Sequence, residues 1–448
     1  GSLDTFIKDS MSGNFIFRVD DKEKGLDKYW FSNASETEME YVGDITEFFS
    51  HGSKRYFVQL DETGNRYKIY QTNYTKAGTV EIVSDVGKDL SGNAAYISNQ
   101  VGSFNKRKLD DYLVFKSKND SSDNNALYCL NVNDNSITRI HSSSDSIFGI
   151  HIASTTEILY LQSVGGIGYY LYYSDCTQAN TRRVTSVSHT QLDYYMLNGN
   201  DIYFANDDDI YQADKSTPDS EAIFLPLANN ELNLRSGSDQ RVRSMSIINS
   251  GNTLLFSGGW SNQMPYYMPL SGTNAFVLSE DLESGTEDDL DSSYGNRMEF
   301  DVFNESAVLI SDSNNIWITE GAPSSTFKVG DACEDDFIDQ AGERIFICFN
   351  GVYSSDGTSA GTSTLSTVVY WNGGIFTSND QSKAFIHLGN FMGSVGGIYK
   401  LEAASLNQVI DFSAYGFTSA SMKHYSESRD ELYIYANISG EPNQLWVY

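Results

Sequence analysis

The sequence predicts an all-β fold, a single large β-propeller of four-stranded antiparallel blades with about ten repeat units over residues 1–448. The composition favours strands and turns, because the chain has 29 Tyr, 25 Phe and 36 Gly but only 6 Pro. A pattern of strands recurs about every 45 residues, and one turn sequence recurs with it. Eight blades with irregular insertions, or two smaller propellers, are the alternatives.

Each unit is expected to contain strand A, a short turn, strand B, a variable loop, strand C, a short turn and strand D. Residues 5–8 are expected to form strand A of the first unit, and the B and C strands are the clearest throughout. The B and C strands are expected in pairs at 15–19 and 29–31, 56–60 and 67–70, 112–115 and 127–130, 158–161 and 169–173, 202–204 and 210–211, 253–256 and 266–268, 308–310 and 316–318, 344–347 and 352–353, 385–388 and 398–401, and 432–435 and 445–448.

The turn that follows strand C is best preserved in residues 352–365, V-Y-S-S-D-G-T-S-A-G-T-S-T-L. An Asp side chain such as Asp356 can cap its own backbone, a Gly such as Gly357 accepts positive φ, and Thr hydroxyls can bond the returning chain. Partial copies lie at 70–79, 172–181 and 317–326, with a fainter one at 30–39. The motif is therefore interpreted as structural turn chemistry.

These residues resemble a known repeat, the E-L-W-x-x-D-G-T-x-x-G-T type of secreted and surface-anchored bacterial proteins. The spacing of the resemblance covers most of the chain, whereas the motif itself covers three or four units. The resemblance implies a propeller fold and an extracellular or bacterial cell-surface location. It implies no activity, because proteins with this repeat are varied.

The connections fall into two classes by length. The A–B and C–D turns are short, as at 198–200, 249–252 and 340–343, whereas the B–C and D–A connections vary. In a propeller, the B–C and D–A connections open on one face, and long loops on a rigid scaffold commonly carry binding residues. That face is the predicted site of function, with long loops expected at 116–126, 226–240, 257–265, 279–296 and 388–396.

Two tryptophans are candidate ligand contacts because they fall outside the C-strand positions of the repeat. Trp260 lies in the expected loop 257–265, and Trp371 also departs from the repeat pattern. The apolar face of an exposed indole ring can stack on a sugar ring.

The acidic segment 279–293, S-E-D-L-E-S-G-T-E-D-D-L-D-S-S, is a candidate calcium site. Clustered carboxylates repel one another unless they are solvated or neutralised, and Ca²⁺ prefers oxygen ligands. The spacing does not match an EF-hand loop, so a solvated acidic loop is the alternative. The candidate ligands are Glu280, Asp281, Asp288, Asp289 and Asp291.

The four cysteines are Cys129, Cys176, Cys333 and Cys348. Cys333 and Cys348 flank a predicted hairpin and lie roughly opposite each other, which predicts a disulfide and an oxidising compartment. Cys129 and Cys176 lie in consecutive repeats, and their pairing is a weaker prediction.

The net charge of −30 argues against a nucleic-acid partner and against an anionic membrane surface. No apolar run is long enough to span a bilayer, so no membrane insertion is expected. Gly1-Ser2 is typical of a cloning remnant, so a targeting segment is expected to have been removed. The chain is expected to be a monomer or part of a larger chain.

These features favour a binding or adhesion propeller that recognises a glycan or a surface protein through its long-loop face, rather than an enzyme. One alternative is a polysaccharide-degrading enzyme, a lyase or a hydrolase, although the pattern of the six His selects no catalytic pair. Another alternative is a structural scaffold domain of a larger surface protein.

Overall fold

The structure is a computed structural model of the chain. It describes residues 4–448 except for 12–13, 22–25, 34–38, 44, 52–53, 61–66, 84–108, 110, 120–123, 167, 187, 190–191, 193, 207–208, 227–241, 259–263, 273, 279–298, 305, 311–314, 332, 334–337, 368–369, 379–381, 390–395, 404, 427–429 and 439–443. It divides into two compact units: Gly1–Tyr203 with Gln212–Ala222, and Phe204–Tyr211 with Ile223–Tyr448.

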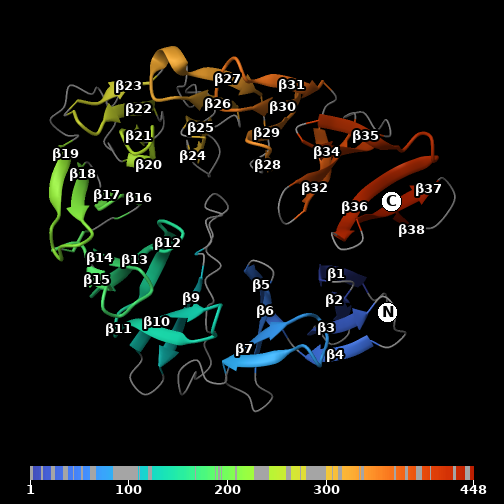
Figure 1. Ribbon diagram of the computed structural model, residues 1–448, viewed down its shortest axis with the longest axis horizontal. Coiled ribbons are helices and arrows are strands. Elements are labelled where there is room, and N and C mark those ends of the chain that lie inside the picture. Colours follow the sequence, from blue (N-terminus) through green and yellow to red (C-terminus); the bar gives the residue numbers. More distant parts are fainter. Residues whose placement is uncertain are drawn as a thin grey trace. The chain divides into compact units, whose positions relative to one another are not determined.

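The described residues form ten antiparallel sheets (Figure 1), eight of four strands and two of three. The first four sheets comprise β1 (Asp4–Met11), β2 (Asn14–Asp21), β3 (Leu26–Asn33) and β4 (Met39–Gly43); β5 (Ile45–His51), β6 (Lys54–Leu60), β7 (Tyr67–Thr72) and β8 (Val80–Val83); β9 (Tyr112–Asn119), β10 (Asn124–Asn131) and β11 (Ile137–Ser143); and β12 (Ile147–Ile152), β13 (Ile158–Val164), β14 (Gly168–Ser174) and β15 (Arg182–Arg183).

The next three sheets comprise β16 (Tyr194–Asn198), β17 (Asp201–Asn206), β18 (Asp209–Asp214) and β19 (Ala222–Pro226); β20 (Val242–Ile248), β21 (Thr253–Gly258), β22 (Met264–Pro269) and β23 (Phe276–Val277); and β24 (Glu299–Phe303), β25 (Ser306–Ile310), β26 (Ile316–Thr319) and β27 (Phe327–Gly330). The short 3-10 helix η3 (Pro323–Ser325) precedes β27.

The last three sheets comprise β28 (Ile338–Gln340), β29 (Glu343–Cys348), β30 (Gly351–Ser355) and β31 (Ser363–Ser366); β32 (Tyr370–Thr377), β33 (Lys383–Leu388), β34 (Gly397–Glu402) and β35 (Ser405–Asp411); and β36 (Phe417–Ser426), β37 (Glu431–Ile438) and β38 (Gln444–Val447). Strands follow one another in chain order across each sheet, which is the meander of a propeller blade. The all-β prediction and the four-stranded antiparallel unit are confirmed.

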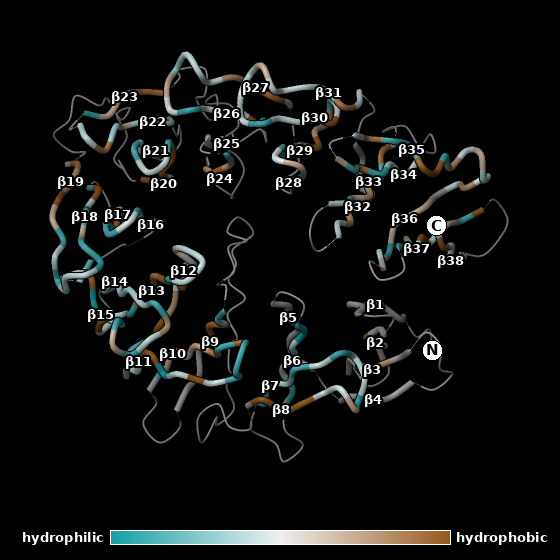
Figure 2. The backbone as a smooth tube through the Cα atoms, in the orientation of Figure 1, coloured by the Kyte–Doolittle hydropathy of each residue, from teal (hydrophilic) through white to brown (hydrophobic). Residues whose placement is uncertain are grey.

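The hydrophobic core lies between consecutive sheets within each unit. Tyr56 and Ile69 of the second sheet pack with Phe115 and Leu130 of the third. Likewise, one cluster joins β29 and β30 of the eighth sheet to β33 and β34 of the ninth. Hydrophobic stretches recur along the strands (Figure 2). Every residue of β21 and all but the first residue of β29 are buried, so both faces of these strands are covered.

A stacked aromatic pair joins strands B and C at the same place in several sheets. Phe57 of β6 stacks on Tyr70 of β7 with ring centroids 4.9 Å apart and an interplanar angle of 14°. Stacked aromatic pairs are worth about 1 kcal/mol beyond the area they bury. The pair fixes the register of B against C, and its other members are Phe115–Tyr128, Tyr160–Tyr172, Phe204–Tyr211 and Phe256–Tyr266.

The prediction of a long loop at 116–126 is wrong, because most of these residues continue the strands on both sides. Lys116 pairs with Leu127 and Asn119 pairs with Asn124 in the β9–β10 ladder. The expected loop 257–265 is also too long, since β21 extends to Gly258 and β22 begins at Met264. A strand can continue through polar residues when their backbone groups are still hydrogen-bonded to the neighbouring strand. In the described part of the chain, no helix is long and apolar enough to cross a membrane.

Candidate functional site

Most residues predicted to bind a ligand lie outside the described residues. Trp260 is among them, whereas Trp371 lies in β32 with its side chain outside the described part. The described residues contain no group of three or more His, Cys, Asp or Glu placed to hold a metal ion. The predicted calcium ligands also lie outside the described residues: Glu280, Asp281, Asp288, Asp289 and Asp291.

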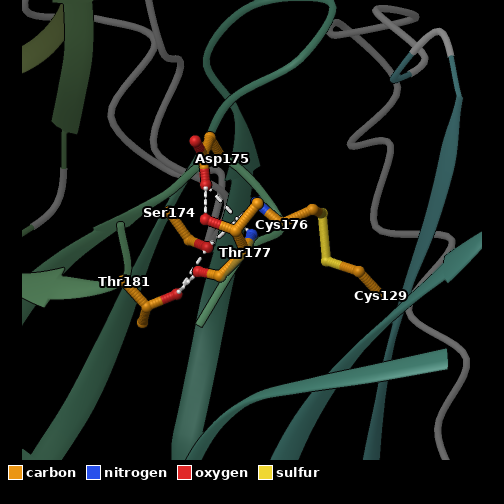
Figure 3. Close-up of a disulfide and its surroundings, with 6 residues drawn as sticks. All are labelled: Cys129, Ser174, Asp175, Cys176, Thr177 and Thr181. Atoms are coloured by element: carbon orange, nitrogen blue, oxygen red, sulfur yellow. Dashed lines mark hydrogen bonds between the residues drawn. A yellow bond between two sulfur atoms is a disulfide. The ribbon is translucent and has the colours of Figure 1, made fainter. Parts of the chain in front are cut away.

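The four cysteines form two disulfides in the structure. Cys333 is bonded to Cys348, and both residues are buried within the eighth repeat. Cys129 of β10 is bonded to Cys176, in the turn that follows β14 (Figure 3). The first disulfide links residues of one hairpin, whereas the second joins consecutive sheets.

The C–D turn is held by its own side chains. In turn 355–362, the hydroxyl oxygens of Ser355 and Thr362 lie 2.7 Å apart. Oδ1 of Asp356 accepts hydrogen bonds from the backbone N–H of Thr358 at 2.8 Å and from its hydroxyl at 2.7 Å. These bonds hold the pKa of Asp356 below its ordinary value. Turns 72–79 and 174–181 repeat the pattern.

The third residue of each turn approaches the preceding sheet from a left-handed backbone. Its φ is 64° at Tyr74, 66° at Cys176, 87° at Gly321 and 98° at Gly357. A Cβ added to Gly357 would lie 3.1 Å from Oγ of Ser306 in the preceding sheet. The Asp-Gly-Thr sequence is therefore a docking turn between sheets.

One charged cluster joins the first strands of two consecutive sheets in the second unit. Arg344 of β29 donates from Nη1 to Oδ2 of Asp301 in β24 at 2.6 Å. The same guanidinium binds both carboxylate oxygens of Asp339 in β28, at 2.7 and 2.9 Å. The Phe303 ring lies under the guanidinium, 4.7 Å from its carbon. We refer to Asp301, Asp339 and Arg344 as the carboxylate pair cluster.

The two carboxylates of the carboxylate pair cluster have different environments. The Asp301 side chain is 24% exposed and that of Asp339 is 50% exposed, whereas that of Arg344 is only 7% exposed. Burial raises the pKa of Asp301 above its ordinary value, and it outweighs the opposing effect of the Arg344 charge. Burial acts to lower the pKa of Arg344, but the two carboxylates reverse this and raise it. Paired acids in unlike environments are typical of acid–base sites.

The carboxylate pair cluster lies at the A–B turn end of its strands, opposite to the end where the sequence predicts the working face. Asp339 is paired with Arg344 across the hairpin that contains Gly342. The sequence places Asp339 and Arg344 five residues apart, which could have indicated a hairpin pair. It gives no sign of Asp301, which belongs to the preceding repeat.

Three of the histidines, His141, His189 and His387, are held in packed positions. His141 bonds Gln162 through Nε2 at 3.0 Å, and His387 packs on Phe412 with ring centroids 5.0 Å apart. Burial lowers the pKa of His141, His189 and His387, which favours their neutral forms. These three rings are therefore weaker candidates for proton transfer than the carboxylate pair cluster.

No protein-family model and no curated protein matches the chain. Among solved structures, the chain is similar to a prolyl endopeptidase, with 9% identity and a TM-score of 0.41 over 74% of this chain and 54% of that one. It is similar to an oligogalacturonate lyase from Vibrio parahaemolyticus, with 12% identity and a TM-score of 0.35 over 68% and 86%. It is also similar to the β-propeller domain of the Trilobed protease from Pyrococcus furiosus, with 9% identity and a TM-score of 0.33 over 73% and 98%.

The chain spans about half the length of the prolyl endopeptidase. The solved structures it resembles include peptidases and oligogalacturonate lyases. The prediction of a binding or adhesion propeller is therefore wrong on this comparison. The choice of reaction depends on the chain's own residues.

Proposed function

We propose that the chain is a polysaccharide-degrading enzyme of the hydrolase type and that Asp301 and Asp339 are its two catalytic carboxyl groups. The observation that carries the proposal is the carboxylate pair cluster, in which one guanidinium holds a buried and an exposed carboxyl group. Most glycoside hydrolases use two carboxyl groups with separate roles, one protonated and one ionised.

The environments of the two groups assign those roles. The raised pKa of Asp301 favours the protonated form, so this group is the acid that protonates the leaving-group oxygen. Asp339 is more exposed and accepts two hydrogen bonds from Arg344. It is the nucleophile or the base that activates water. Arg344 positions both carboxyl groups and does not itself form a bond to the sugar.

The test is an assay of the purified full chain on neutral polysaccharides and on polyuronates. Reducing ends report hydrolysis, whereas an unsaturated product absorbing in the ultraviolet reports a lyase. We expect reducing ends without unsaturation, and a loss of at least about 100-fold in kcat for Asp301→Asn and for Asp339→Asn. Asp219→Asn is the matched control, since Asp219 also binds an arginine, Arg183, but its side chain is 40% exposed against 24% for Asp301.

Two outcomes would contradict the hydrolase proposal. One is the absence of sugar release from every polysaccharide by folded wild-type protein. The other is an active wild type whose kcat is unchanged by Asp301→Asn and Asp339→Asn, with melting temperatures confirming that both variants are folded. An unsaturated product would move the proposal to the lyase class.

The second candidate is a structural scaffold domain, which is favoured by the contacts between consecutive sheets. Asn304 donates to the carbonyl of Gly342 at 2.7 Å, and Gln340 donates to the carbonyl of Ser382 at 2.6 Å. The carboxylate pair cluster has the same inter-sheet character. A scaffold predicts that Asp301→Asn lowers stability while no substrate is turned over.

We also propose that the ten sheets are ten blades of one ring, of the repeat type that the turn motif resembles, and that the protein is extracellular. The repeated docking turns and the two disulfides support this. A projection of the purified protein by electron microscopy tests the number of blades. Eight blades, or two separate rings, would contradict it.

Calcium binding by the acidic segment 279–293 remains a separate proposal, supported by its run of carboxylates. A bound ion stabilises the folded state by mass action, so a chelator is expected to lower the melting temperature. An unchanged melting temperature would contradict a tight stabilising site. Sugar contact by Trp260 and Trp371 is tested by their alanine variants in the same polysaccharide assay.

A further inference from the structure

We infer that the Cys129–Cys176 disulfide is a covalent lock, opened by reduction, on the seam between the third and fourth sheets. Cys129 lies in β10 of the third sheet, and Cys176 lies in the C–D turn of the fourth, with Cα atoms 5.6 Å apart (Figure 3). Reduction is inferred to free this turn from the third sheet while each sheet keeps its fold.

The first two sheets contain a non-covalent equivalent of this lock. Tyr74 is the third residue of turn 72–79, as Cys176 is of turn 174–181, and both have a left-handed φ. The Tyr74 ring packs on Phe31 of the preceding sheet, with centroids 5.9 Å apart. Tyr74 and Cys176 are each only 2% exposed. One covalent and one aromatic contact therefore occupy the same seam position.

The partners on the preceding sheet are also equivalent. Cys129 follows Tyr128, which stacks on Phe115 as the C-strand member of the repeated aromatic pair. Phe31 follows Trp30, the corresponding C-strand residue in the turn motif of the first repeat. Cys129 and Phe31 thus occupy matching positions, so the two contacts are alternative solutions to one packing problem.

The turn itself does not depend on the disulfide. The hydroxyl oxygens of Ser174 and Thr181 lie 2.8 Å apart, and the backbone N–H of Cys176 donates to Oγ of Ser174 at 3.1 Å. Oδ1 of Asp175 accepts from the N–H and hydroxyl of Thr177 at 3.0 and 2.6 Å (Figure 3). Turn 355–362 forms the same bonds without a cysteine. Reduction therefore removes the bond to the third sheet and leaves the turn formed.

Other contacts keep the third and fourth sheets together after reduction. A shared core cluster includes Leu127 and Ile140 of the third sheet with Ile158 and Tyr160 of the fourth. His141 bonds Gln162 across the same seam. The seam therefore opens locally at the turn. A small thiol left at Cys176 cannot fill the place that the Tyr74 ring fills.

The reaction is a two-electron thiol–disulfide exchange with a dithiol reductant. The Cys129–Cys176 S–S bond breaks, each sulfur gains one proton and one electron, and the two thiols of the reductant form their own disulfide. Dithiothreitol is the probe, applied to the full chain.

The experiment uses the Cys333→Ala/Cys348→Ala variant, so that Cys129–Cys176 is its one described disulfide. Once thiol titration shows complete reduction, we expect the melting temperature to fall by about 5 °C. Trypsin is expected to cleave faster after Arg182 and Arg183, which follow the turn. The far-ultraviolet circular dichroism is expected to stay unchanged.

The matched variant adds Cys129→Phe and Cys176→Tyr, which copies the Phe31–Tyr74 pair. Its melting temperature is expected to lie near that of the oxidised parent and to be insensitive to dithiothreitol. Unchanged melting and unchanged cleavage after complete reduction of the parent would overturn the inference. Loss of the circular dichroism signal would also overturn it, because it would show global unfolding. If the Phe/Tyr variant or its parent does not fold, trypsin cleavage after Arg182 and Arg183 in reduced wild-type protein decides, because this readout is local to the turn that contains Cys176.

Discussion

Tyr74 and Cys176 occupy the same position in two copies of one hydrogen-bonded turn, and each reaches the preceding sheet from a left-handed backbone. Tyr74 does so with a ring packed on Phe31, and Cys176 with a covalent bond to Cys129. Where the residue is Gly321 or Gly357, the preceding sheet lies against the backbone itself. The copies of the turn therefore share the position that contacts the preceding sheet, although the residue at that position differs.

The crowding at Gly357 predicts a stability loss larger than backbone strain alone. Both Gly357 and Gly342 have positive φ, but only Gly357 lies against a preceding sheet, while a Cβ at Gly342 would meet nothing within 4 Å. Gly342→Ala is expected to cost about 1 kcal/mol, and Gly357→Ala about 2 kcal/mol. Urea unfolding measures both. Equal losses would contradict a steric contact at Gly357.

The carboxylate of Asp356 caps the turn 355–362, so its removal is expected to destabilise the protein. Asp356→Ala is expected to lose about 1 kcal/mol at pH 7, whereas Asp356→Asn keeps an acceptor, as Asn73 does in turn 72–79. Urea unfolding of both variants at several pH values measures the effect.

The pH dependence at Asp356 follows from its lowered pKa. A carboxyl whose folded pKa lies below its unfolded value, which is about 3.9, adds stability above that pH and loses it as pH falls through the folded pKa. The deficit of Asp356→Ala is therefore expected to shrink in acid. A deficit that stays constant down to pH 2 would contradict this.

Removing Arg344 is expected to leave the largely buried Asp301 carboxyl group without its hydrogen-bond donor. Arg344→Met is expected to cost about 2 to 4 kcal/mol, because the more exposed Asp339 can be solvated and Asp301 only in part. Adding Asp301→Asn is expected to recover part of the loss in urea unfolding. A double variant as unstable as the sum of the single variants would contradict direct coupling.

The raised pKa of Asp301 predicts the pH profile of the proposed hydrolase. The acid form is lost as pH rises through this pKa, so kcat/KM is expected to fall on the alkaline side at a pH above the ordinary range of Asp. Arg344 opposes the rise in the pKa, so Arg344→Met is expected to shift this limb to higher pH. If Arg344→Met left the alkaline side of the kcat/KM profile at the same pH, Asp301 would be excluded as the catalytic acid.

Raised and lowered carboxyl pKa values act on stability with opposite signs. The raised pKa of Asp301 means that its protonation favours the folded state, so its contribution is complete below the unfolded pKa and is lost as pH rises through the folded pKa. Asp301→Asn is therefore expected to gain in stability relative to wild type from acid to neutral pH. Thermal melting at a series of pH values measures this difference.

Much of the strand pattern could be predicted because it depends on neighbours in the chain. The B and C strands at 56–60 and 67–70 are recovered in β6 and β7, since alternating Tyr, Phe and Val fit a pleated sheet with two covered faces. Strand ends were less predictable. Residues 116–119 and 124–125 are polar, yet the backbone ladder continues through them.

The candidate site was not predictable, because its members come from different repeats. Asp339 and Arg344 are near in sequence, but Asp301 precedes them by a whole repeat and reaches Arg344 only across the packing of two sheets. The long-loop face that the sequence predicts as the working face lies opposite to the end that carries this cluster. Long loops show where a scaffold tolerates insertions, and they do not show where charged side chains gather.

The local chemistry of the chain sufficed for the strand repeat, the turn with its Asp and Thr, and the pairing of Cys333 with Cys348 within one hairpin. Those features depend on backbone dihedrals and on side chains a few residues apart. The packing of consecutive sheets decided the rest: that the third turn residue docks on its neighbour, and that Arg344 joins two carboxylates of unequal burial. Burial and cross-sheet distance set those contacts and the pKa of Asp301, and both arise only when the sheets are packed.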